Sequence, residues 1–332
     1  MAPLFSSIGG LIIDDIVYQD GKRVQDVLGG GGVFAVYGMR LWHLDSESKH
    51  VGYIVHKGFD YPSQIDQELN QLDISILSIH HPDKHTTRGL NTFRENDHRD
   101  FEYIHPIIRV TADDFPDSWI QSLKILHLIC SAERAIEIVD QWRAREQQLE
   151  AAYPTQFIWE PLPWACLPEN LDCIIEAAKQ IDIISPNHEE LANMLGFDFH
   201  ELLAQKRHDV KHTTEHLAQE FISKVSCTLV VRVGKYGALV MQETPSWVPA
   251  YWNWKEESQH VVDVTGAGNT FCGGFAYGWI QTKGDAHASA YYGAVAASYA
   301  VEQVGVPDIT QWKVKDKPEF RLNRLKNQSC VF

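Results

Sequence analysis

The residues best suited to chemistry are Gly266, Ala267 and Gly268, in the stretch VVDVTGAGNTFCGGF. We expect a strand to end at Asp263 and a helix to begin at Asn269, on either side of these small residues. Glycines allow a ligand close to the backbone, and the N–H groups and dipole of a helix start attract anions. The turn therefore predicts an anion hole for a phosphoryl group during transfer. Taken alone, it would equally suit a tight strand-to-helix connection.

Two further motifs follow predicted strands and could serve a nucleotide. RVGKYGALV places Gly234 and Gly237 in a turn that could lie against the nucleotide. SPNHEE supplies Asn187 and Glu190, an oxygen-bearing pair of the kind that organises hydrated Mg²⁺. Ligands of doubly wound sheets bind beyond the carboxyl ends of the strands, and both motifs lie at such ends. We therefore expect them to share one site with the anion hole.

The N-terminal part of the sequence offers groups for a second substrate. We expect IGGLIIDD to end the first strand at Asp14, whose carboxylate could accept hydrogen bonds from substrate hydroxyls. Gly29 and Gly30 begin the run GGGG, which leaves room for a ligand beside the backbone. These residues predict an acceptor site opposite the nucleotide.

The elements that must position these residues alternate along the chain. Short apolar runs typical of buried strands are separated by segments of helical periodicity. This order predicts a doubly wound α/β fold, with a mostly parallel sheet and helices on both faces. The expected strands are residues 4–14, 123–130, 156–162, 181–187 and 227–234, and the expected helices include 133–152, 168–180 and 288–305.

Two segments depart from this alternation. Residues 16–32 resemble a hairpin around Asp20-Gly21, and residues 86–110 are turn-rich and then strand-like. We expect both to form a small β lid inserted into one α/β domain that spans residues 1–312. The basic residues 313–332 are interpreted as a C-terminal surface tail.

Composition excludes several classes of partner. The formal net charge is -15, which argues against a nucleic-acid or anionic-membrane surface. The six cysteines show no C-x-x-C spacing and are interpreted as reduced thiols. No apolar run approaches the length of a membrane span, so we expect a cytoplasmic protein without membrane contact. An acidic protein that binds phosphates must use local backbone N–H groups, a helix start and a metal ion.

The ordered set of motifs resembles the PfkB, or ribokinase-like, family of carbohydrate and nucleoside kinases over roughly residues 5–310. DVTGAGNTFCGGF is close to the family signature D-x-T-G-A-G-D, and TTRGLNTFRENDHRDFEY and SPNHEELANMLG are most similar to the fungal maintenance-of-killer branch. The resemblance implies a central sheet, a β lid, Mg-ATP as donor and a small sugar- or nucleoside-like hydroxyl compound as acceptor. It also implies a possible homodimer formed through the lid.

The resemblance assigns a role to each motif residue. It implies acceptor binding by Asp14, Gly29 and Gly30; Mg²⁺ and phosphate contacts by Asn187 and Glu190; nucleotide contacts by Gly234 and Gly237; and an anion hole at Gly266, Ala267 and Gly268.

Three positions depart from the family pattern. Asn269 stands where the family has its catalytic Asp, and Phe34 stands where an Asn often holds the substrate. WEPLPWAC, residues 159–166, replaces a D-x-N-x-R element. We therefore expect the nucleotide side to be better preserved than the acceptor side.

Asn269 decides between two functions. An amide is not basic near neutral pH and cannot act as a general base. Because phosphoryl transfer is often loose, weak kinase activity could survive, with Asp263, His188 or Glu190 as a substitute base. The alternative is an inactive pseudokinase that binds a nucleotide or metabolite and acts through protein interactions. An acceptor pocket filled by Phe34 or Trp159 would favour this alternative.

Three histidine- or tryptophan-rich segments carry weaker signals. HTTEH places His212 and His216 on one helix face, one turn after His208, which matches an inverted zinc-protease motif or a surface helix. SIHHPDKHTTR gathers His80, His81 and His85 near the lid, as a metal site or a polar loop. WVPAYWNW, with Trp247, Trp252 and Trp254, could face a purine or a partner protein.

Overall fold

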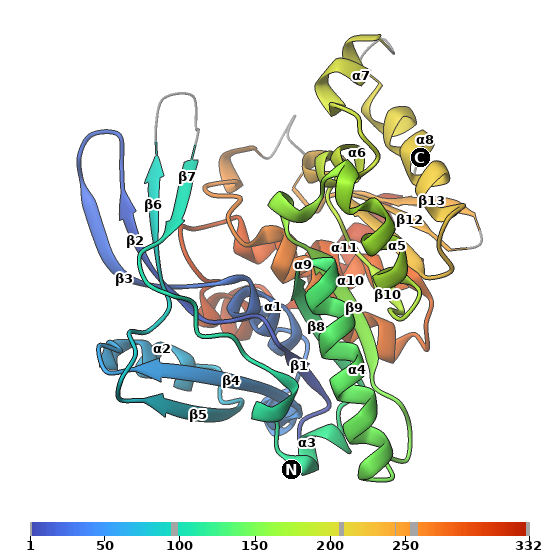
Figure 1. Ribbon diagram of the computed structural model, residues 1–332. Coiled ribbons are helices and arrows are strands. Elements are labelled where there is room, and N and C mark those ends of the chain that lie inside the picture. Colours follow the sequence, from blue (N-terminus) through green and yellow to red (C-terminus); the bar gives the residue numbers. More distant parts are fainter. Residues whose placement is uncertain (1, 94–98, 206–208, 243, 253–257, 330–332) are drawn as a thin grey trace.

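The computed structural model describes residues 2–93, 99–205, 209–242, 244–252 and 258–329. Its centre is a sheet of nine strands (Figure 1). The strands from β11 to β5 run parallel, and β12 and β13 extend this sheet as antiparallel strands. In spatial order they are β13 (Pro245–Val248), β12 (Ala238–Met241), β11 (Thr228–Arg232), β10 (Ile183–Ile184), β9 (Gln156–Pro161), β8 (Ile125–Cys130), β1 (Phe5–Ser7), β4 (Val51–Gly58) and β5 (Ser75–His81).

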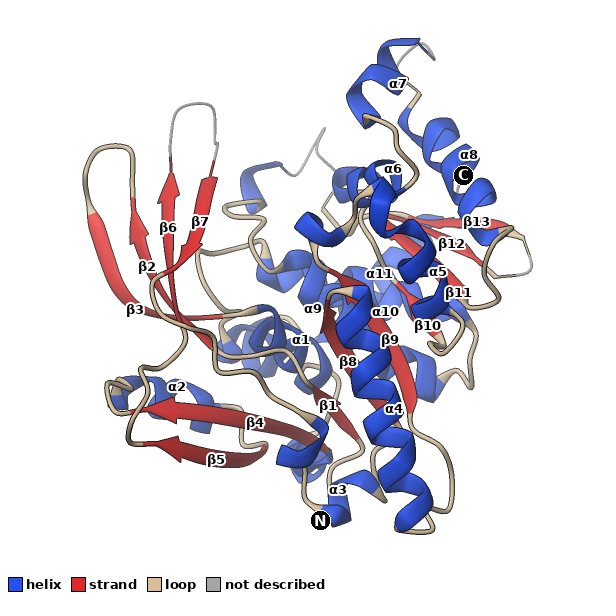
Figure 2. Ribbon diagram, viewed as in Figure 1, coloured by secondary structure: helices blue, strands red, loops and turns tan. Residues whose placement is uncertain are grey.

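Helices cover both faces of this sheet (Figure 2). One core contains apolar residues of α1 (Gly31–Arg40), α2 (Ser63–Gln71), α9 (Ala267–Gln281), α10 (Ala286–Ala300) and α11 (Pro318–Ser329). The other contains residues of α3 (Asp117–Ile120), α4 (Ala132–Gln148), α5 (Leu171–Ala178), α6 (His188–Met194), α7 (Phe199–Gln205) and α8 (Val210–Ile222).

Strand residues alternate between these two cores. Val230 of β11 belongs to the first core, whereas its neighbours Leu229 and Val231 belong to the second. All three are fully buried, because a strand covered on both faces hides successive side chains on opposite sides. The predicted doubly wound α/β fold is therefore confirmed. Among the described residues, no helix is long and apolar enough to span a membrane.

A second sheet of four strands stands beside the body (Figure 1). β2 pairs with β3 in antiparallel fashion and with β6 in parallel fashion, and β6 pairs with β7 in antiparallel fashion. We call this sheet the lid. Its order is β3 (Arg23–Gly29), β2 (Ile12–Val17), β6 (Arg88–Phe93) and β7 (Arg99–Tyr103). The turn between β2 and β3 contains Gly21 with a φ of 82°, at the predicted Asp20-Gly21 position.

The predicted first strand, residues 4–14, is divided between the two sheets. The chain leaves the main sheet after β1 and enters the lid at Ile12. At the crossing, a Cβ on Gly9 would lie only 2.7 Å from the Cα of Gly32 in α1. Gly9 therefore marks a close passage between the two sheets and not the interior of one strand. The expectation that Asp14 ends a strand of the main sheet is wrong, because Asp14 lies within β2 of the lid.

Two other expectations about local structure are also wrong. Residues 261–263 do not form a strand; the N–H groups of Val262 and Asp263 donate to the carbonyl of Val301. The supposed surface tail contains α11, whose Leu325 is 1% exposed and packs in the core. Arg321 of α11 is also buried, because Glu302 and Asp316 neutralise its charge.

Candidate active site

Two cavities lie on either side of the start of α9. The first, which we call the lid cavity, is about 670 Å³ and lies between the lid and the body. The second, which we call the turn cavity, is about 560 Å³ and borders the turn at Gly234–Gly237. Gly268 lines the turn cavity, and a Cβ on Gly31, which lines the lid cavity, would lie 3.0 Å from Nδ2 of Asn269. The first turn of α9 therefore separates the two cavities.

The turn before α9 has a fixed shape. Gly266 is the N-cap of α9 with a φ of 75°, and a Cβ there would lie 2.3 Å from the ring of Phe34. The carboxylate of Asp263 accepts hydrogen bonds from the N–H and the hydroxyl of Thr265, at 2.9 and 2.8 Å. The first N–H groups of a helix lack carbonyl partners within that helix and can bind an anion, although the N–H of Ala267 donates to the carbonyl of Val264 at 3.2 Å. Gly266, Ala267 and Gly268 thus stand together at a helix N-terminus, although the helix begins at Ala267 and not at Asn269.

Asn269 contacts a carboxylate that sequence reasoning did not select. Its Nδ2 lies 2.8 Å from Oε2 of Glu160, the penultimate residue of β9. The same Oε2 lies 3.2 Å from Nε2 of His127, whose Nδ1 is 2.9 Å from the hydroxyl of Ser7. Because an ionised carboxylate only accepts hydrogen bonds, both Asn269 Nδ2 and His127 Nε2 are donors. This network joins β1, β8, β9 and α9.

Arg232 carries the positive charge of the site. Its Nη1 lies 2.5 Å from Oε1 of Glu160, and its Nη2 lies 3.3 Å from Oε2 of Glu190. The guanidinium also covers the start of α9, since a Cβ on Gly268 would lie only 1.9 Å from Nη1. Burial alone raises the pKa of Glu160, but Arg232 and the donors His127 and Asn269 outweigh it and lower that pKa to about 2.

Asn187 and Glu190 form the cap of α6. The Asn187 Oδ1 accepts from the N–H of Glu190 at 2.8 Å, and Glu190 Oε2 accepts from the N–H of Asn187 at 2.7 Å. This is a capping box, which satisfies the first N–H groups of a helix. Burial raises the pKa of Glu190, although Arg232 and the Asn187 N–H oppose that shift. The pair therefore stabilises the helix and at the same time places two oxygen-bearing side chains beside Arg232.

The turn cavity is bordered on one side by the turn at Gly234–Gly237. Gly234 and Gly237 have φ values of 50° and 93°, and a Cβ on Gly237 would lie 2.0 Å from the carbonyl oxygen of Val248. Tyr251 and Trp252 also line this cavity. These two residues are the part of the aromatic segment 247–254 that faces the cavity. Trp247 donates its Nε1–H to Glu215 of α8, and Trp254 lies outside the described residues.

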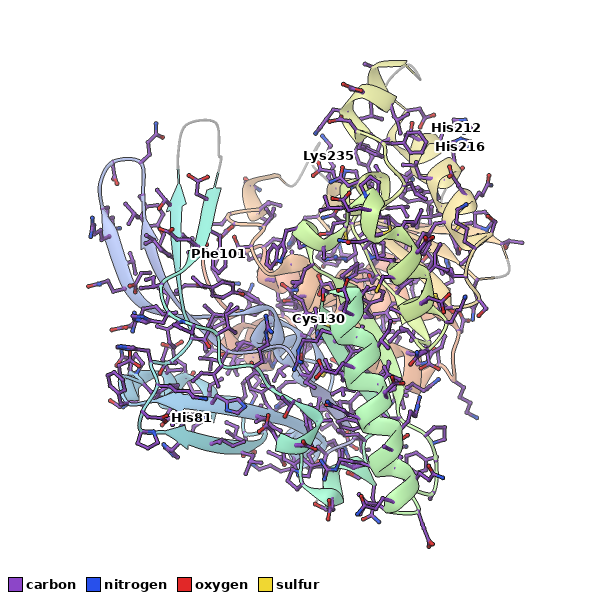
Figure 3. The ribbon with its side chains drawn as sticks, in the orientation of Figure 1. His81, Phe101, Cys130, His212, His216 and Lys235 are labelled. Carbon is purple, nitrogen blue, oxygen red and sulfur yellow. The ribbon has the colours of Figure 1, made fainter. Side chains whose placement is uncertain are left out.

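The acceptor-side residues lie in the lid and at its junction with α1. Asn91 Nδ2 donates to Oδ1 of Asp14 at 3.0 Å, and a Cβ on Gly29 would lie 1.9 Å from Oδ2 of Asp14. Gly29 is therefore required for the carboxylate to fit, and Gly30 follows it with a φ of 99° as the N-cap of α1. Phe101 of the lid and Cys130 at the end of β8 line opposite sides of the lid cavity (Figure 3).

The residues proposed to fill the acceptor pocket do not line the lid cavity. Phe34 is 4% exposed and packs beneath Gly266. Trp159 is fully buried in the core, and its Nε1–H donates to the carbonyl of Cys130 at 3.0 Å. The filled pocket that would favour an inactive protein is thus not found among the described residues.

The three substitute bases suggested by motif proximity all have partners, and Glu190 is held by Asn187 and Arg232 as described above. Asp263 is bonded within its own turn, and Nδ1 of His188 lies 3.4 Å from the carbonyl oxygen of Arg232. Burial lowers the pKa of His188. Sequence reasoning missed Glu160 and Arg232, yet one signal was available: each is a charged residue at the carboxyl end of an otherwise apolar, buried strand.

The histidine motifs lie away from the two cavities. His212 and His216 project from α8 at the surface (Figure 3), and His208 lies outside the described residues. His81 pairs with His56 at 2.6 Å. His85 lies apart, 2.8 Å from Asp60, with its ring stacked on that of His105 at an interplanar angle of 11°. Parallel stacked imidazoles cannot both direct an in-plane lone pair at one ion, so the ring geometry argues against a shared metal there.

Comparisons with known proteins identify the family of this chain. The sequence model of the pfkB family carbohydrate kinases matches residues 5–312. An uncharacterised protein of Schizosaccharomyces pombe is 33% identical over 326 residues, which are 92% of this chain and 86% of that protein. Protein MAK32 of Saccharomyces cerevisiae is 30% identical over 315 residues, which are 90% of this chain and 84% of that protein.

Solved structures show the same fold. A ribokinase from Giardia lamblia superposes with a TM-score of 0.72 at 15% identity, covering 98% of this chain and 99% of that one. An Arabidopsis thaliana ribokinase complexed with ribose and ATP gives a TM-score of 0.66 at 17% identity, with coverages of 98% and 99%. Since the family match spans nearly the whole chain and is supported by two fungal relatives, this chain belongs to the pfkB family of carbohydrate kinases.

Proposed function

We propose that this protein transfers the terminal phosphoryl group of Mg-ATP to a hydroxyl group of a small sugar- or nucleoside-like acceptor. The observation that carries this proposal is the position of Gly268 and Asn269. They lie in the first turn of α9: Gly268 lines the turn cavity, and Nδ2 of Asn269 lies close to Gly31, which lines the lid cavity together with Ile12 and Phe101 of the lid. A transferring phosphoryl group needs both substrates at one anion-binding point.

In this proposal the turn cavity binds the nucleotide. Because Gly234 and Gly237 have no side chains, the nucleotide could lie close to their backbone. Tyr251 and Trp252 would offer aromatic surface to the base. The phosphates would extend toward Gly268, which lines the same cavity. The fold-level likeness to a ribokinase from Cryptococcus neoformans in complex with ADP supports this assignment.

The donor set beside this cavity fits Mg²⁺ held through its water shell. Asn187 and Glu190 supply oxygen atoms, the ligand type that Mg²⁺ prefers. Both side chains are already bonded in the capping box, so direct coordination would remove bonds that hold α6. When bound to the phosphates, Mg²⁺ supplies charge neutralisation, and Asn187 and Glu190 would orient its waters.

The acceptor would bind in the lid cavity. Asp14, held by Asn91, would accept hydrogen bonds from acceptor hydroxyls, since a carboxylate is an acceptor only. Phe101 would cover the acceptor from the lid side.

A homodimer would form through the lid, where the side chains of Tyr103 and Ile104 are 36% and 42% exposed. Measuring the mass of the protein in solution tests this homodimer.

The chemistry depends on charge stabilisation and not on a strong base. Asn269 would orient the acceptor hydroxyl by a hydrogen bond, while Arg232 and the start of α9 would stabilise charge on the transferring group. General-base assistance contributes about 10² to 10⁴-fold in enzymes that have it, so its absence predicts slow turnover.

The test is acceptor-dependent ADP release with Mg-ATP across sugars, nucleosides and vitamins. We expect one acceptor to stimulate ADP release by the wild type. Asp14→Asn should then raise the KM for that acceptor and leave ATP affinity unchanged. ATP binding without acceptor-dependent release by any compound would contradict the kinase function.

A second function is favoured by one specific feature of the site. The transfer point is occupied by a closed set of side chains, in which Arg232 is held by Glu160 and Glu190, and Asn269 by Glu160. Such a set would suit a protein that binds a nucleotide or metabolite without reaction and acts through a partner. Tight ATP binding with no turnover, together with a partner-dependent change in that affinity, would support this alternative.

A further inference from the structure

The hydrogen bond between Asn269 and Glu160 fixes the direction of the Asn269 side chain. Glu160 is 4% exposed, and its Oε2 lies 2.8 Å from Nδ2 of Asn269. Because the ionised carboxylate has no proton to donate, the amide must present its nitrogen to Glu160. The other end of the amide, Oδ1, is then directed away from Glu160. An amide oxygen accepts hydrogen bonds, which is what a hydroxyl group about to be phosphorylated requires.

We propose that Glu160 is the positioning residue of the transfer site: it orients Asn269 so that Oδ1 accepts the hydrogen bond of the acceptor hydroxyl. The carboxylate next to the start of α9 is therefore supplied by Glu160 of β9 and not by residue 269 itself. Glu160 and Asn269 act as one unit, in which a carboxylate and an amide have fixed places. This inference rests on the proposed phosphotransferase function, but its structural part can be measured without turnover.

The charges around Glu160 explain why residue 160 and residue 269 cannot both carry a carboxylate. Glu160 is surrounded by four side chains: His127 from β8, Arg232 from β11, and Asn269 and Cys272 from α9. Glu190 from α6 is linked to it through Arg232. These residues include one permanently charged cation, Arg232, for two carboxylates. The charge of Arg232 is thus already shared by two carboxylates, and His127, which is charged only when protonated, is the one other residue of this set that could balance a third acid.

A carboxylate at position 269 would therefore not become a useful base. Asn269→Asp would place a second carboxylate about where Nδ2 now lies, 2.8 Å from Oε2 of Glu160. Two buried carboxylates at that distance share a proton, because like charges cannot both ionise there. The raised pKa of the introduced carboxyl would favour its neutral form, so the variant gains stability as pH falls and loses stability as pH rises through that pKa.

Exchanging the two groups restores one carboxylate and one amide. Glu160→Gln combined with Asn269→Asp has the same total charge as the wild type, whereas each single variant differs by one unit. In the exchanged protein, the amide at position 160 can donate to the carboxylate at position 269, and Arg232 remains beside Gly268 to balance the charge. The exchanged pair is thus the matched control for the Asn269→Asp single variant.

The first experiment measures the melting temperature of the four proteins, the wild type, the two single variants and the exchanged variant, at pH 8 and pH 5. We expect Asn269→Asp to melt at least about 4 °C below the wild type at pH 8 and to recover much of this difference at pH 5. The exchanged variant should melt closer to the wild type at pH 8 than the sum of the two single changes predicts. Equal melting of Asn269→Asp and the wild type at pH 8, or strict additivity, would overturn the pairing.

The second experiment measures turnover once an acceptor is known. The exchanged variant should give a kcat at least about tenfold above that of Asn269→Asp at pH 8, because only the exchanged variant has a fully ionised carboxylate at position 269. Glu160→Gln should raise the acceptor KM more than the KM for ATP, since it frees the amide of Asn269 to rotate. The reverse ranking of the two kcat values would overturn the positioning role. Coupled melting without turnover in any protein would retain the pairing and reject the kinase function.

Discussion

Arg321 and Arg232 are both largely withdrawn from solvent, and they are held in different ways. Arg321 of α11 has a side chain that is 2% exposed, with Nε bonded to Asp316 at 2.7 Å and Nη1 bonded to Glu302 at 2.6 Å. Its guanidinium also lies 3.7 Å from the ring centroid of Tyr299. Arg232 of β11 has a side chain that is 14% exposed, borders the turn cavity, and has an Nε without a hydrogen-bond partner among the described residues.

The difference separates an arginine that holds the fold from one that can serve a ligand. Arg321 is surrounded by groups from α10 and the segment before α11, so its charge is satisfied within the protein. Arg232 pairs closely with Glu160 but more loosely with Glu190, at 3.3 Å, and it faces a cavity. A buried cation that adjoins empty space at a helix N-terminus is suited to a phosphate.

The largest effect should come from Arg321→Leu. Removing one partner of a buried charge pair leaves Glu302 uncompensated, which costs about 3–5 kcal/mol of the free energy of unfolding. Arg23→Leu, at an exposed position in β3 of the lid, should cost less than about 0.5 kcal/mol. Urea denaturation of the two variants checks this difference. Equal losses would show that Arg321 contributes no more than a surface arginine.

The next effect is the pH dependence that Glu160 confers. Its pKa falls from 4.5 to about 2 on folding, so its contribution is present above pH 4.5 and is lost as pH falls toward 2. This contribution is on the order of 3 kcal/mol. The difference in unfolding free energy between wild type and Glu160→Gln should therefore be full at pH 7 and small near pH 2.5. A constant difference across this range would rule out the ion pair as its source.

Arg232→Lys should have a smaller effect, on nucleotide affinity. Lysine keeps the charge but loses the planar fork that reaches Glu160 and a phosphate together. We expect the affinity for a non-hydrolysable ATP analogue to fall about tenfold, which corresponds to roughly 1.4 kcal/mol. Calorimetric titration measures it, with Arg23→Lys, on the lid and outside the turn cavity, as the control. Unchanged affinity in Arg232→Lys would place the phosphates away from this residue.

The sequence correctly indicated the parts of the candidate site that depend on backbone conformation. The glycines at 234, 237 and 266 all have positive φ, so their spacing reported a local constraint that no distant residue alters. The alternation of apolar runs was informative for the same reason, because it reflects a sheet covered on both faces.

The sequence was less informative where side chains meet across the fold. Asn269 was identified as the altered position, but its partner Glu160 is 109 residues away, and the contact between them depends on the packing of α9 on β9. Asp14 was placed on the wrong sheet because Gly9 and Gly10 were interpreted as part of one strand. The basic composition of residues 313–332 concealed Arg321, whose burial depends on Glu302 in an earlier segment.

The smallest effect compares two glycines that both face open space. Gly234 and Gly21 have φ values of 50° and 82°, and a Cβ at either would meet no atom within 4 Å. Alanine at either position should therefore cost a similar amount, about 1 kcal/mol, because of the left-handed backbone alone. Only Gly234 lies in the turn cavity next to Arg232, so only Gly234→Ala should also weaken ATP binding, by about threefold to tenfold. Equal ATP affinity in both variants would mean that the space at Gly234 is not where the nucleotide lies, and Arg232 would then be a structural arginine like Arg321.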